Sequence, residues 1–128
     1  MFSIKQIEEA HSRVSTGADF PRYIAEIRNL GVTSFKFNVS DGKEIYYGEN
    51  SYQAVSEPKY DPKIIQSDVN LPTFTKELID HQQGKTDFPH FIKICAENGV
   101  NNWIVDLEKM VCTYFDSHGN KILQEPLG

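Results

Sequence analysis

The residues best suited to chemistry in this sequence are two imidazoles and a carboxylate that lie close together. His81, Asp87 and His90 fall within ten residues, where one helix is expected to end and the next to begin. Such a set could ligate zinc or another divalent metal in an open site. The spacing matches no established zinc pattern, and an aspartate before Phe-Pro is also expected as a helix cap. We favour a capping Asp87 with two surface histidines, and we expect no cofactor.

Cys95 and Cys112 could each supply a nucleophilic thiolate if a histidine lay near enough to act as base. Cys95 continues an apolar helical stripe, and Cys112 lies in a stretch with strand character. These contexts favour small buried residues over activated thiolates. Two cysteines are too few for a disulfide framework, so both are expected to be reduced.

Asp19 and Asp87 could form a pair of carboxylates for acid–base work, because both stand in the sequence Asp-Phe-Pro. The same context explains both as helix caps, which is the interpretation we favour. His11 lies on an otherwise apolar helical face, and we expect it to be a partly buried histidine of the core. Its counterpart in the second half is Leu78, which indicates that the position can be purely apolar.

These candidates belong to a sequence with two similar halves. Residues 19–58 align with residues 87–126 without a gap. The identical pairs are Asp19/Asp87, Phe20/Phe88, Pro21/Pro89, Ile24/Ile92, Gly31/Gly99, Val32/Val100, Tyr46/Tyr114, Glu57/Glu125 and Pro58/Pro126. Ordinary residue usage would give far fewer matches by chance, so the pattern indicates an internal duplication.

The periodicity predicts two helices and then strands in each half. Ile4, Ile7, His11 and Val14 fit one face of a first helix that ends near Gly17. Its copy covers residues 71–81 and ends at Gly84. A second helix begins at each Asp-Phe-Pro and ends at a Gly-Val step.

Past each Gly-Val step the apolar residues alternate, which predicts strands. Strands are expected at 35–39, 44–47 and 51–55, and again at 103–107, 111–115 and 121–124. Asp41-Gly42 predicts a two-residue hairpin turn between the first two strands.

The predicted fold class is therefore α+β, with helices packed on antiparallel sheet around a pseudo-two-fold axis. We expect a single domain over residues 1–128, with repeat one at about 4–58, a connector at 59–70 and repeat two at about 71–126. The sequence leaves open whether the two halves share one sheet.

Composition disfavours several classes of function. The net charge is −5, and no cluster of basic residues occurs, which disfavours nucleic-acid binding. Acidic residues follow the N-terminus, and no run approaches the roughly 20 apolar residues of a membrane span, so we expect no membrane association and a cytoplasmic location. The apolar content of 39% is that of a folded chain.

Several stretches together resemble one protein family. They are Gly-Ala-Asp-Phe-Pro at 17–21, Ser-Glu-Pro-Lys-Tyr-Asp at 56–61, His-Gln-Gln-Gly-Lys-Thr-Asp at 81–87, Cys-Ala-Glu-Asn-Gly-Val at 95–100 and Cys-Thr-Tyr-Phe-Asp at 112–116. The chain is similar from end to end to short bacterial and prophage-borne proteins classed as a domain of unknown function and sometimes labelled "phage envelope protein". No catalytic residue can be assigned to this chain from the resemblance.

The duplication also predicts where a binding site would lie, because selection can act on positions at which the two copies differ. The polar differences are Lys36/Ile104, Asn38/Asp106, Tyr47/Phe115 and Arg22/His90, together with Tyr60 and Asp61 in the connector. They predict a ligand site lined by Asn38, Tyr47, Tyr60, Asp106 and Phe115. The alternative, which we favour, is a polar strand face that meets water.

Two functions remain open on the sequence alone. We favour a small non-catalytic binding or interaction module whose partner is a small molecule or a protein, with a homodimer also open. The alternative is a small metal-dependent or cysteine-dependent enzyme.

Overall fold

The computed structural model describes residues 2–14 and 19–127 and has the α+β architecture predicted from the sequence. In chain order the elements are α1 (Ile4–His11), α2 (Phe20–Asn29), β1 (Ser34–Asn38), β2 (Glu44–Tyr47), a 3-10 turn η2 (Glu49–Ser51), β3 (Gln53–Val55), α3 (Leu71–Gln82), α4 (Phe88–Glu97), β4 (Asn102–Asp106), β5 (Val111–Phe115) and β6 (Lys121–Pro126). The order helix, helix, strand, strand, strand occurs twice, as the repeat predicts.

Both halves contribute to one antiparallel sheet, which answers the question that the sequence left open. The strand order is β3-β2-β1-β4-β5-β6, so the first strand of each half pairs with the other at the centre. In that pairing Lys36 lies opposite Ile104, and the repeat alignment equates these same two positions. This register is the one that a two-fold relation between the halves requires.

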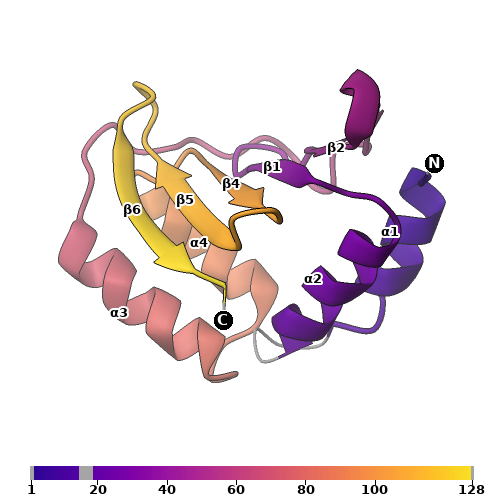
Figure 1. The fold of residues 1–128 in the computed structure, drawn as a ribbon. Helices are drawn as coiled ribbons and strands as arrows, with labels where there is room; N and C mark the ends of the chain where they lie inside the picture. Colours follow the sequence, from indigo (N-terminus) through magenta and orange to yellow (C-terminus); the bar gives the residue numbers. More distant parts are fainter. Residues whose placement is uncertain (1, 15–18, 128) are drawn as a thin grey trace.

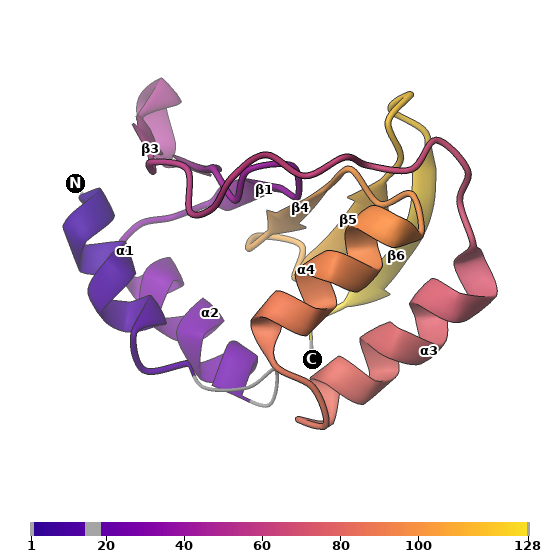
Figure 2. The same ribbon diagram turned by 180° about the vertical axis from the view of Figure 1, so that it is seen from behind.

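All four helices lie on one side of the sheet, with α1 and α2 at the β3 end and α3 and α4 at the β6 end (Figure 1 and Figure 2). Alternate strand residues face the helices and form the core, because successive side chains point to opposite faces. Phe35, Phe37, Trp103 and Val105 are all buried in this way on the two central strands. The opposite face is more open, and Ile104 there is 36% exposed.

The connector, residues 59–70, forms hydrogen bonds with both halves along one end of the sheet. It runs the width of the sheet from β3 to the start of α3 (Figure 2). Lys63 N–H donates to Ser40 O in the first hairpin at 2.7 Å, and Gln66 N–H donates to Ala96 O in α4 at 2.9 Å. Gly99 has φ +83°, and a Cβ there would lie 2.6 Å from Asp68 O, so only glycine permits this close approach.

Two sequence predictions about element ends need correction. Helix α1 ends at His11, before Val14, and Gly17, the predicted stop, lies outside the described residues. The first hairpin turn is longer than two residues. Gly42 N–H donates to Asn38 O, and Asn38 N–H donates to Lys43 O, so the turn encloses residues 39–42.

None of the helices in the described ranges is long and apolar enough for a membrane crossing.

The predicted capping aspartates behave differently. Asp87 caps α4, since its Oδ1 accepts a 3.0 Å hydrogen bond from His90 N–H. Asp19 stands at the same place before α2, but its backbone is in the helical region and its side chain makes no capping bond to that helix. Asp19 Oδ1 instead lies 3.6 Å from Arg22 Nη2. The capping prediction is therefore confirmed for Asp87 and wrong for Asp19.

We expect Asp87→Ala to lower the free energy of unfolding by about 1 kcal/mol, the usual cost of a lost helix cap. Asp87→Asn is the matched control, because asparagine keeps an oxygen that can accept from His90 N–H. Urea unfolding of both variants checks the prediction. Equal stability of the alanine and asparagine variants would contradict the capping role.

Candidate functional site

A cavity of about 270 Å³ lies between α1 and the outer strands of the first half. Helix α1 lines it with Ile4, Ile7, Glu8, His11 and Ser12, strand β2 with Glu44 and Tyr46, and the segment after β3 with Ser56 and Lys59. We call this cavity the α1 pocket. Its first wall begins at Ser3, which caps α1 and exchanges hydrogen bonds with Gln6 in a capping box. The pocket thus combines a buried aliphatic side with titratable groups.

Glu44 is the central charged group of the α1 pocket. It is only 6% exposed, because β2 turns its side chain toward the helices. Lys59 Nζ lies 2.8 Å from Glu44 Oε1, and Tyr46 Oη donates to Glu44 Oε2 at 2.6 Å. Ser56 also holds the backbone of this residue, since Glu44 N–H donates to Ser56 Oγ at 2.8 Å. Both carboxylate oxygens are therefore fixed in place.

A second tyrosine extends this network into the core. Tyr23 Oη lies 2.9 Å from Tyr46 Oη, and because the hydroxyl hydrogen of Tyr46 is donated to Glu44, Tyr23 is the donor in this bond. Burial raises the pKa of both phenols, and the nearby Glu44 charge raises it further. The chain Tyr23, Tyr46, Glu44 is therefore a line of neutral donors that ends on an anion.

His11 closes the pocket from α1. Its ring meets the edges of Tyr23 and Phe88, with ring centroids 5.2 and 6.3 Å apart. Burial lowers the pKa of His11 and outweighs the attraction of Glu44 for the protonated form. The imidazole is therefore neutral at pH 7 and offers the pocket one donor and one acceptor.

We expect the protein to lose stability as the pH falls below about 6.5, the pKa of an unfolded histidine. Burial lowers the pKa of both His11 and His81, so the unfolded chain takes up these protons first and the stability present above pH 6.5 is lost as the pH falls through the folded-state values. Urea unfolding between pH 5 and 7.5 measures the slope. His11→Gln should flatten it, while His118→Gln, at an exposed turn, should not; equal slopes would contradict the assignment.

The second half lacks the charged groups and the histidine of the α1 pocket at the aligned positions. Glu44 aligns with Cys112, Tyr23 with Phe91, Lys59 with Leu127 and His11 with Leu78. Tyr46 is kept as Tyr114, whose Oη donates to Glu125 Oε1 on β6 at 3.2 Å. The same fold therefore forms in the second half without a charged pair at this place.

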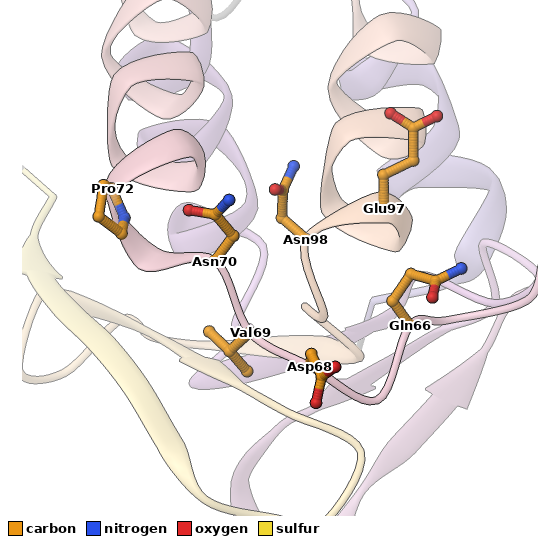
Figure 3. A pocket seen from close by; sticks show the side chains of 7 residues that line it. All are labelled: Gln66, Asp68, Val69, Asn70, Pro72, Glu97 and Asn98. Carbon is orange, nitrogen blue, oxygen red and sulfur yellow. The ribbon is translucent and has the colours of Figure 1, made fainter.

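A second hollow, of about 610 Å³, lies where the connector meets α3 and α4 (Figure 3). Its asparagines serve the helix ends, since Asn70 Oδ1 accepts from Thr73 N–H and Asn98 Nδ2 donates to Ile94 O. Its two carboxylates, Asp68 and Glu97, belong to exposed residues. This hollow is open, its asparagines have structural partners and its carboxylates are exposed, so we favour the α1 pocket as the candidate site.

The structure does not gather the three predicted metal ligands into one set. Asp87 caps α4, His90 Nε2 lies 3.3 Å from Glu77 Oε2, and His81 stacks on Phe91 with ring centroids 4.4 Å apart. Within residues 2–14 and 19–127, no three His, Cys, Asp or Glu side chains are grouped as a metal ion would need.

Four residues of the predicted ligand face lie on or beside the central strands, at opposite ends, and the fifth, Tyr60, lies in the connector. On β1 and β4, Asn38 pairs with Asn102 and Asp106 with Ser34, which separates the two sites by about 13 Å along the strand. Tyr47 lies beside Ser34, and Phe115 lies beside Asn102.

Two of these five side chains have clear structural partners. Asp106 Oδ1 accepts from two amides of the β4–β5 turn, and Tyr60 Oη donates to Val39 O at 2.6 Å. Neither of the two hollows described above is lined by any of the five. Ligand binding on this face stays a prediction.

Both cysteines are buried free thiols, as expected from their apolar contexts. Burial raises the pKa of the Cys95 thiol well above its usual value and that of Cys112 to about 12. Neither is therefore a thiolate at neutral pH, which is the form that attacks electrophiles.

Sequence reasoning missed Glu44, Lys59 and Tyr46 as site residues and treated His11 as core. The sequence signal that could have found them is the difference between the two copies of the repeat. A comparison of the two copies singles out Glu44/Cys112 and His11/Leu78 as changes of charge or polarity on inward faces. The predicted ligand face consists mainly of outward-facing strand positions, where a polar residue is ordinary.

Comparison with known proteins gives a family and no activity. No curated protein matches the chain. A family model with the description "Protein of unknown function (DUF1398)" matches residues 8–126, which is nearly the whole length and includes every described strand of the sheet. The chain therefore belongs to this family of proteins of unknown function.

Proposed function

We propose that the protein is a non-catalytic binding module that holds a small polar molecule in the α1 pocket. The observation that carries the proposal is Glu44, a carboxylate that is 6% exposed in the wall of a cavity and is held by Lys59 and Tyr46. A group fixed at both oxygens is preorganised for a ligand, because binding then costs little side-chain ordering.

Stability alone is a poor reason for this arrangement. Removing a carboxylate and an ammonium from water costs several kcal/mol per ion, and apolar replacements of similar volume often serve as well or better. The second half offers such a replacement at the aligned positions, with Cys112 and Leu127. The retained charges in the first half therefore favour a role in recognition.

Catalysis by cysteine has less support than binding. Both thiols are buried, and neither lines the α1 pocket. The neutral phenols of Tyr23 and Tyr46 are likewise held as hydrogen-bond donors, since burial raises the pKa of each. The groups that face the cavity suit the fixed recognition of polar atoms.

A variant that fills the pocket tests this function. Ser12 lies at the exposed lip of the cavity, and Ser12→Trp should block it, whereas Ser117→Trp places the same side chain on a distant exposed turn. Native mass spectrometry of tag-free protein, and amide chemical shifts recorded during a small-fragment screen, report binding. We expect pocket amides to respond in the parent protein and the Ser117 variant only. Equal responses in the Ser12 variant would refute the site.

The setting of this module is proposed on sequence grounds. The resemblance to bacterial and prophage-borne proteins supports a bacterial source. A cytoplasmic location is likewise a proposal. A homodimer is a further proposal, which size-exclusion chromatography with light scattering would check.

A further inference from the structure

We propose that the ligand of the α1 pocket carries a primary ammonium group on a short aliphatic body. This inference rests on the proposed function and names the chemical class of its ligand. Three properties of the pocket support it: the balance of charge, the balance of donors and acceptors, and the size and apolar character of one wall.

The charges around the pocket sum to a negative value. Glu8 on α1 and Glu44 on β2 contribute two carboxylates, and Lys59 contributes the one ammonium among the lining residues. His11 adds no charge at pH 7, because burial lowers its pKa. One negative charge is left uncompensated, which attracts a monocation and repels a carboxylate of equal size.

The hydrogen-bonding groups of the pocket are mostly acceptors. Each oxygen of Glu44 accepts one bond from Lys59 or Tyr46 and can accept a second. Glu8 is exposed on the facing helix and offers two more oxygens. An ammonium has three donors and no acceptor, so it satisfies such a wall better than a hydroxyl or an amide.

The remaining wall limits the size and the polarity of the rest of the ligand. Ile7 is 2% exposed and Ile4 packs on the same core, so α1 presents an aliphatic surface next to the carboxylates. The volume of about 270 Å³ lies below the roughly 300–1,000 Å³ typical of drug-sized ligands. A short alkyl chain that ends in an ammonium matches both features.

Titration with three compounds of similar shape tests the ligand class: n-butylammonium, n-butanol and butyrate. Amide chemical shifts of residues around the pocket report site and affinity for the parent protein. We expect butylammonium to bind at the pocket at least about tenfold more tightly than butanol, a difference of about 1.4 kcal/mol for one charge-assisted contact. Butyrate should not shift the pocket amides.

Two variants locate the charge that matters. Glu44→Gln should weaken butylammonium binding at least about tenfold. Glu125→Gln is the matched control, because it removes the tyrosine-bonded carboxylate of the second half and should leave the affinity unchanged. If Glu44→Gln fails to fold, the exposed Glu8→Gln should weaken binding about threefold or more, and its failure to do so overturns the assignment.

The outcomes separate the two proposals. Tighter binding of butanol or butyrate than of butylammonium at the pocket would overturn the ammonium class and keep the binding function. No response of the pocket amides to any of the three compounds, together with an equally silent fragment screen, would overturn both.

Discussion

Trp103→Ala should lower the free energy of unfolding by about 3–5 kcal/mol, the usual cost of emptying a large aromatic site in a core. Trp103 is 7% exposed and lies flat on Phe37, with ring centroids 4.5 Å apart and planes 6° from parallel. Phe91 and Tyr114 complete its surroundings at 5.7 and 5.8 Å. These contacts join β4, β1, α4 and β5 at the middle of the molecule.

Urea unfolding measures the loss, and the neighbouring Ile104→Ala provides the control. Ile104 belongs to the same strand but faces outward and is 36% exposed, so its truncation should cost less than about 1 kcal/mol. Trp103→Phe installs the residue of the aligned position, Phe35, and should fall between the two. Native fluorescence of this single tryptophan should be blue-shifted. A loss no larger than that of Ile104→Ala would contradict its place in the core.

The burial of Trp103 was predictable because a strand has only two faces. Once Phe35, Phe37 and Val105 are assigned inward, alternation fixes the side of every other residue on β1 and β4. The same rule predicted the six strands and the α+β class. Turn length was harder to predict, because Asp41-Gly42 fits both a two-residue turn and the four-residue loop that the connector holds through Lys59 N–H and Asp41 O.

The aspartates before the two Phe-Pro sequences show where sequence identity stops being informative. Asp19 and Asp87 are both followed by Phe-Pro, yet Asp87 has ψ 173° and caps α4, while Asp19 has ψ −6° and does not cap α2. Capping requires an extended residue before the helix. The chain before these aspartates differs in length by one residue between the halves, so an identical Asp-Phe-Pro does not determine the backbone of its aspartate.

The candidate site was missed because its parts are far apart in sequence. His11, Glu44 and Lys59 come from a helix, a strand and the start of the connector, and only the packing of α1 over β2 brings them to one cavity. No short motif joins them. By contrast, the predicted metal residues are close in sequence, but the helical geometry turns His81 and His90 to different partners.

The charged pair of the α1 pocket should behave as a coupled unit. Lys59→Leu leaves the Glu44 carboxylate 6% exposed with Tyr46 as its main donor, and we expect a loss of about 2 kcal/mol. Breaking a fully buried ion pair costs about 3–5 kcal/mol. The expected loss is smaller here because the Lys59 side chain is 29% exposed and the pair is partly solvated. Lys93→Leu, at an exposed position of α4, should change stability by less than about 0.5 kcal/mol.

Replacing both partners should recover most of that loss. The double variant Glu44→Cys with Lys59→Leu installs the residues found at the aligned positions, Cys112 and Leu127, and removes the uncompensated charge. We expect its stability to lie within about 1 kcal/mol of the parent protein, so the two changes are strongly non-additive. Additive losses in the cycle would mean that the two side chains are not energetically coupled, which would contradict this prediction. Near-parent stability together with lost butylammonium binding would instead mean that the charges serve recognition, since the fold then needs neither of them.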